Sequence, residues 1–194
     1  MGRSGGSDGN EQLTAIVATV LLVLLAVEGA TLLSIRALLS VHAFVGMLLV
    51  PPIALKLAST GWRMGRYYFR GEEYVRRGPP HVLLRALVAP VVVASTVVLF
   101  ATGIALLALG QTEGFVVGLH KASFVVWFGA TSLHVLTRLP RLLEGLRRRV
   151  PGTGARLAVA CTAVVAGLGV AVLTLPAADT LQDHASGVVG VDRR

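Results

Sequence analysis

Five apolar runs dominate this 194-residue chain, and each is long enough to cross a lipid bilayer. A bilayer core is about 30 Å thick, and an α-helix needs about 20 apolar residues to span it, because it rises about 1.5 Å per residue. The chain is 54% hydrophobic and only 14% charged, which excludes an ordinary soluble domain. We therefore predict five spanning helices, over Leu13 to Leu33, Leu39 to Ser59, Val82 to Leu109, Phe115 to Leu136 and Leu157 to Leu175.

The predicted fold class is an all-α integral membrane protein whose five helices form one bundle. We expect the bundle to occupy residues 12–176, between a flexible glycine-rich tail over residues 1–11 and a polar tail over residues 177–194. In the fifth helix, Gly167 and Gly169 offer close backbone approach to a neighbour. Cys161 in the same helix is expected to be a small buried hydrophobe.

The net charge of +8 is distributed along the chain as in multi-pass membrane proteins. Basic residues cluster between the second and third helices and between the fourth and fifth, whereas the link over residues 110–114 has none. This alternation predicts a cell-membrane (inner-membrane) protein with a cytoplasmic N-terminus and an extracytoplasmic C-terminus. Lipid, and no nucleic acid, is the expected partner of these charges. A cleaved signal peptide fits less well, because the first apolar run is too long and only Arg3 precedes it.

His120 and His134 lie in one predicted spanning helix. Fourteen residues bring the second imidazole to within about 40° of the first and about 21 Å along the helix axis. Two histidines on one stripe, one near each membrane face, are the arrangement that holds two stacked haems. Ionisable side chains within a membrane are costly and are therefore functional candidates. The alternative is that both histidines only form hydrogen bonds between helices.

The other histidines supply candidate partners at two depths. His42 lies at the same depth as His120, so this pair is the expected outer haem site, with both side chains as iron ligands. His81 is the histidine closest in depth to His134, and the two are candidate ligands of an inner haem, although His81 also fits a solvated interfacial position. Because Cys161 is the only cysteine, covalent attachment is excluded and any haem is of b type.

Several further residues are candidates for cofactor binding. Gly46 and Gly118 lie close to the outer pair in sequence and would leave room for a flat macrocycle. Lys121 and Arg36 could meet the propionates of an outer haem and Arg85 those of an inner one, unless each simply extends to its membrane interface.

Two other features have a structural and a functional interpretation. Glu28 is expected to form an ion pair with Arg36 or Lys121, with a proton relay to a quinone as the alternative. The aromatic and arginine-rich stretch over residues 61–70 is expected to anchor a helix end in the headgroup layer, or to dock a soluble redox partner.

These residues resemble the membrane cytochrome b subunits of formate dehydrogenases and nickel-iron hydrogenases, within the cytochrome b561-like superfamily. In that family a His-x13-His pair on the fourth helix and a histidine on the second helix bind b haems around a four-helix core. His120, His134 and His42 match those roles, and the likeness covers about residues 13–137. The chain is also similar to small uncharacterised actinobacterial members of the same superfamily. The family takes its fourth ligand from the first helix, which has no histidine here, so either His81 substitutes or one haem binds.

The sequence thus predicts a membrane b-type cytochrome with one or two haems. It would pass electrons across the bilayer between a partner oxidoreductase and a quinone or an external acceptor, as an electron-transfer subunit rather than a complete enzyme. The same sequence features also fit a haem-dependent reductase that acts directly on an external metal or quinone. The alternative from another class is a cofactor-free permease or assembly factor with structural histidines.

Overall fold

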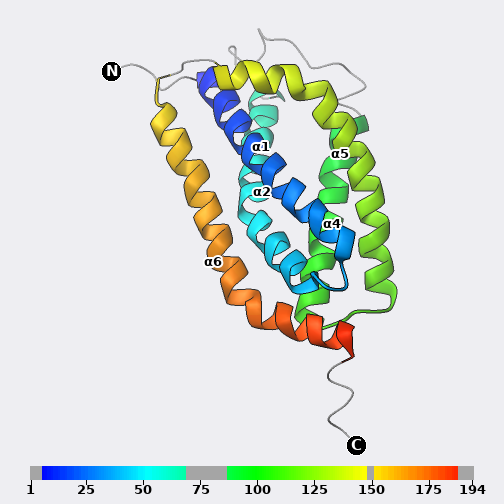
Figure 1. The fold of residues 1–194 in the computed structure, drawn as a ribbon. Coiled ribbons are helices and arrows are strands. Elements are labelled where there is room, and N and C mark those ends of the chain that lie inside the picture. Colours follow the sequence, from blue (N-terminus) through cyan, green and yellow to red (C-terminus); the bar gives the residue numbers. More distant parts are fainter. Residues whose placement is uncertain (1–5, 69–86, 148–150, 188–194) are drawn as a thin grey trace, which may run out of the picture.

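The computed structural model describes residues 6–68, 87–147 and 151–187, which are helical apart from short turns (Figure 1). Its elements are α1 (Gly6–Thr31), the short 3₁₀ helix η1 (Leu32–Ser34), α2 (Leu39–Tyr68), α4 (Ala89–Leu109), α5 (Phe115–Arg147) and α6 (Thr153–Ser186). Five of these helices are long and apolar enough to cross a membrane. The prediction of an all-α, multi-pass helical bundle is therefore confirmed.

The helix ends differ from the predicted ones. α1 begins at Gly6, so residues 6–11 continue the helix rather than forming a flexible tail. α6 runs to Ser186, so most of the expected polar tail is also helical, and Gly187 ends the helix in the left-handed conformation at φ 74°. Hydropathy misses these ends because polar residues can extend a helix beyond the bilayer. The predicted start of the third helix at Val82 lies outside the described residues.

Four helices, α1, α2, α4 and α5, surround a common centre (Figure 1). α1 packs against α2 and α5, and α4 packs against the same two helices from the other side. α2 and α5 therefore lie diagonally across the bundle and do not pack directly against each other. Because neighbouring helix axes lie about 8–10 Å apart, a diagonal pair is separated by about 11–14 Å. Side chains that leave α2 and α5 toward the centre can meet there.

Two short connections, residues 32–38 and 110–114, lie at one end of the bundle, which we call the short-loop end. The last part of α6 crosses this end (Figure 1), where Ala178 and Leu181 are buried with Leu107 of α4. Gln182 ties α6 to the first connection: its Oε1 accepts from the backbone N–H of Ser40 at 3.2 Å, and its Nε2 donates to the Arg36 carbonyl at 2.6 Å. α6 thus covers part of the short-loop end.

Outside the four-helix core, α6 packs mainly against α2 at a point where α2 has lost a hydrogen bond. Pro52 is buried within α2 and has no N–H, so the carbonyl of Leu48 lacks its usual helical partner. Gly167 of α6 lies against this carbonyl, and a Cβ at Gly167 would overlap the Leu48 oxygen. A Cβ at Gly169 would meet open space, so of the two predicted approach points only Gly167 is one.

Cys161 is exposed on α6, and the prediction of burial is wrong. The stretch of α6 around Cys161, over residues 157–175, is apolar on all sides, so its sequence does not distinguish the packed side from the side turned away from the bundle.

Candidate functional site

His42 and His120 meet in the centre of the bundle near the short-loop end. His42 lies in the first turn of α2 and His120 in the second turn of α5, so both are close to the start of a helix that leaves this end. Their ring centroids are 6.5 Å apart and the ring planes are nearly perpendicular, at 86°. The structure therefore brings together the two histidines that sequence depth alone paired.

The hydrogen bonds of His42 define which of its ring nitrogens carries the proton. Thr31 Oγ1 uses its own proton in a 2.6 Å bond to the Glu28 carbonyl, so it must accept at its 2.9 Å contact with His42 Nδ1. Glu28 Oε1 lies 3.0 Å from the same nitrogen. We assign the hydrogen to Nδ1, from which His42 donates to these oxygens, so that in the neutral ring Nε2 keeps a free lone pair.

The hydrogen-bond partners of His120 Nδ1 lie on α4. Its Nδ1 lies 3.1 Å from the Leu99 carbonyl oxygen, which can only accept. Thr102 Oγ1 lies 3.1 Å from the same nitrogen and donates its own proton to the Val98 carbonyl at 2.7 Å. Nδ1 of His120 is thus also the protonated nitrogen. Neither Nε2 is hydrogen-bonded to a residue that the structure describes.

Glu28 does not form the ion pair that was predicted for it. Its carboxyl meets His42 inside the bundle, whereas Arg36 and Lys121 are both exposed near the short-loop end, so the expected pairing with either of them is wrong. The reason is helical phase: Glu28 lies one turn before buried Thr31 on the inward face of α1. Its second oxygen, Oε2, is buried without a hydrogen-bond partner among the described residues.

Glycines beside the histidines come from α2 and α4. A Cβ at Gly46 would lie 3.5 Å from Glu28 Oε1, so Gly46 does face the site, as the sequence suggested. Gly118 is exposed with open space around it and does not. Gly103, which the sequence analysis missed, lies against His120, and a Cβ there would come within 3.1 Å of the imidazole Cε1. The adjacent Thr102, a polar residue in a strongly apolar helix, was the available signal.

His134 lies farther along α5 in different surroundings. It is partly buried, and Arg138 and Lys56 are near enough to act on it electrostatically. Lys56 donates to the Thr14 carbonyl at 2.8 Å, which links α2 to α1 at this level. Thr131, one turn before His134, has a buried hydroxyl without a partner in the described part of the chain. No second histidine ring lies against His134 there, and no cluster of three or more metal-ligating side chains occurs in residues 6–68, 87–147 and 151–187.

The predicted partner of His134, His81, and the predicted propionate ligand Arg85 both lie outside the described residues. The inner haem site therefore stays a prediction.

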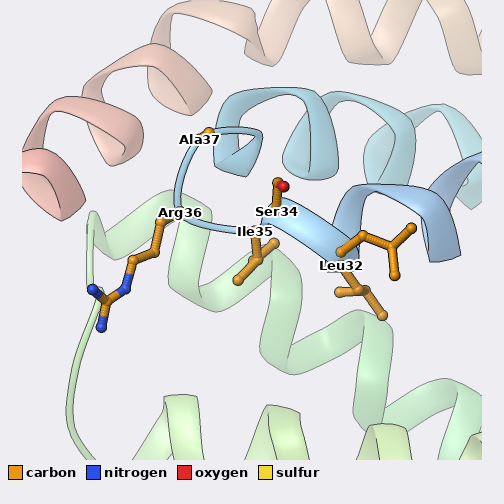
Figure 2. A pocket seen from close by; sticks show the side chains of 6 residues that line it. Leu32, Ser34, Ile35, Arg36 and Ala37 are labelled. Carbon is orange, nitrogen blue, oxygen red and sulfur yellow. The ribbon is translucent and has the colours of Figure 1, made fainter.

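A shallow hollow of about 430 Å³, open to the surface, lies at the short-loop end beside Thr31. It is lined by Leu32, Leu33, Ser34, Ile35, Arg36 and Ala37. Figure 2 shows the Arg36 side chain extending from the turn on the side away from Leu32. An apolar hollow with one basic side chain thus adjoins the residue that supports His42.

In comparisons with protein-family models, with curated proteins and with solved structures, the chain has no significant match.

Proposed function

We propose that the chain is a membrane b-type cytochrome in which His42 and His120 would together hold the iron of one haem. The observation that carries this proposal is the pair of hydrogen-bonded Nδ1–H groups, which directs each histidine to offer its Nε2 lone pair. Histidines that bind metals almost always donate their other ring N–H to a carboxylate, a carbonyl or water. Glu28 serves His42 in this way, and the Leu99 carbonyl serves His120.

The spacing of the pair also supports the proposal. The two ring centroids are 6.5 Å apart in the centre of the bundle, so both side chains could reach one group placed there. The ligands come from diagonal helices, and Gly46 and Gly103 border the pair without side chains of their own. These residues therefore fit a haem held in the centre of a four-helix core.

The residues around the pair would have distinct roles. One-electron chemistry would come from the iron of the bound haem. His42 and His120 would hold the iron, Thr31 and Thr102 would fix the ring orientations, and the four helices would exclude water. With Cys161 as the only cysteine, attachment would be non-covalent. An inner haem at His134 and His81 would complete a path across the bilayer to a quinone, a partner oxidoreductase or an external acceptor.

The orientation belongs to the same proposal. The arginine-rich connections are assigned to the cytoplasm of a cell (inner) membrane, which puts the short-loop end and His42 on the opposite face. Electrons would enter or leave the outer haem on that face.

The decisive experiment is a reduced-minus-oxidised absorption spectrum of detergent-purified protein from haem-supplied cells, with haem quantified per chain. We expect a sharp alpha band and complete extraction of haem by acidified acetone. Folded protein that remains colourless would refute the cytochrome.

Ligand assignment follows from substitution. His42→Ala and His120→Ala should each remove the same haem, and the double variant should remove no more than either one. His184→Ala is the matched control, because His184 is exposed in α6 at the same end of the molecule. His134→Ala should leave this haem in place and remove a second one only if an inner site exists. Loss of the same haem from His134→Ala would refute the pairing.

A cofactor-free membrane protein is the second candidate, and one observation favours it. His42 already joins α2 to α1, and His120 already joins α5 to α4, through hydrogen bonds between helices. Such bonds are each worth about 0.6 kcal/mol in membrane proteins and can justify a buried histidine. The absorption spectrum separates the two functions.

A further inference from the structure

His42 lies in the first turn of α2, where backbone N–H groups need partners from outside the helix. The first helical hydrogen bond of α2 joins the His42 N–H to the Leu38 carbonyl at 2.8 Å. The N–H groups that precede it, including that of Ser40, have no carbonyl of α2 to pair with. The side chain before a helix often supplies an oxygen, but Leu38 has none to offer. The turn that carries His42 therefore needs an oxygen from elsewhere in the chain.

Gln182 of α6 supplies this oxygen through its side-chain amide. Its Oε1 accepts from the Ser40 N–H at 3.2 Å, and its Nε2 donates to the Arg36 carbonyl at 2.6 Å. Because an N–H only donates and a carbonyl only accepts, these partners allow a single orientation of the amide. Arg36 and Ser40 are four residues apart, which is the spacing of an α-helical hydrogen bond. The amide thus bridges two backbone groups that would otherwise pair in a further helical turn before α2.

The segment that carries Gln182 is held against the start of α2 by apolar packing. We call residues 176–186 of α6 the strap, and Figure 1 shows it crossing the short-loop end. An apolar cluster joins the strap to α4 and α2, and its members are Ala178, Leu181, Leu107, Leu39 and Ala43. The two α2 members of this cluster flank His42 in sequence. The strap therefore holds the first turn of α2 both by packing and by the Gln182 amide.

Building on the function proposed above, we propose that Gln182 is a positioning residue, which caps the first turn of α2 and so holds His42 in place at the haem. A helix end that loses its cap frays, and a side chain on a frayed turn no longer keeps a fixed position. A ligand has to be held to within about 0.5 Å by the structure that supports it. Neither hydrogen bond of the Gln182 amide reaches α5, so His120 should not depend on it.

Three variants of the full chain test this role. Gln182→Met keeps the length of the side chain but can form neither hydrogen bond. Gln182→Glu is the conservative variant, because it retains an oxygen that can accept from the Ser40 N–H. Thr180→Ala is the matched control, since Thr180 is exposed on the strap and its hydroxyl donates within α6, to the Pro176 carbonyl.

Hydrogen–deuterium exchange of the purified protein in detergent measures the opening of each helix start without reference to haem. Loss of a helix cap corresponds to about a fivefold change in local opening. We therefore expect residues 39–44 to exchange about fivefold faster in Gln182→Met, and residues 115–120 at the start of α5 to be unchanged. Gln182→Glu and Thr180→Ala should stay close to wild type over both ranges.

Carbon monoxide binding to the reduced protein reports on His42 as a ligand. A haem iron held by two histidines has no open position, so carbon monoxide binds only when one of them leaves. At the same low carbon monoxide concentration, Gln182→Met should bind about fivefold more than wild type, seen as a shift of the Soret band. Gln182→Glu should return to the wild-type level.

Each outcome decides the proposal. Faster exchange over residues 39–44 together with increased carbon monoxide binding, both reversed in Gln182→Glu, supports it. Unchanged exchange there, equal acceleration over residues 115–120 or unchanged carbon monoxide binding overturns it. So does a Gln182→Glu protein without reversal, or a Thr180→Ala protein that behaves like Gln182→Met. Any of these results in a wild type that binds haem leaves the cytochrome proposal standing, whereas a wild type without haem overturns both.

Discussion

Replacing Gly167 by alanine tests the contact between α6 and α2 most directly. The new methyl group would overlap the Leu48 carbonyl oxygen, which belongs to the backbone of α2 and cannot rotate away. To restore van der Waals contact the two helices must separate by roughly 1 Å, and overpacking of this kind costs about 1–3 kcal/mol. Alanine recovers about 0.5–1 kcal/mol because it is a better helix former than glycine. We therefore expect a net loss of about 1–2 kcal/mol.

The assay is thermal unfolding of the purified protein in detergent, followed by tryptophan fluorescence. For a chain of this size, a loss of about 1–2 kcal/mol lowers the midpoint by about 2–8 °C. Gly169→Ala is the matched control, since a Cβ there meets open space on the same helix, and it should leave the midpoint unchanged or slightly higher. A Gly167→Ala protein that unfolds at or above the temperature of Gly169→Ala would show that α6 does not approach α2 at this carbonyl.

Three more predictions follow from the structure. Gly103→Val should lower the haem content per chain without loss of expression, because the valine side chain would displace His120. Gly118→Val is the control, since its side chain meets open space, and equal haem content in the two variants would contradict the site. Cys161→Leu should leave the thermal midpoint in detergent unchanged, since Cys161 is exposed on α6, and a clearly lower midpoint would place its side chain inside the bundle. A reporter fused after Arg194 should be extracytoplasmic, as the basic residues predict, and cytoplasmic activity would reverse the orientation.

The sequence predicted the parts of this protein that depend on length and periodicity. Apolar runs identified five helices, and helix depth alone paired His42 with His120. It could not predict the partner of Glu28, because an acid in a membrane helix has a known cost but no readable direction until the neighbouring helix is placed. The prediction that Cys161 is buried failed for the same reason.

Contacts that depend on the absence of a Cβ atom at one glycine could not be predicted from the sequence either. Gly103 lies against His120 and Gly167 against α2, yet each is one of 22 glycines in the chain. Gly118 and Gly169 also lie within long apolar helices, but without such a contact. The helix ends depend on which polar residues continue to fold beyond the apolar core, and hydropathy does not report this. Such features require the relative rotation of packed helices.

The position of α6 determines on which side of the bundle a domain fused after this helix would lie. A core of four crossings has its beginning and its end in the same compartment, but a fifth crossing sends the end of the chain to the other one. α6 ends at Ser186 at the short-loop end, where Gln182 contacts Ser40 at the start of α2, whereas α1 begins at the far end. A domain tethered after α6 would therefore stand next to the histidine pair, and one tethered before α1 would be separated from it by most of the thickness of the bilayer.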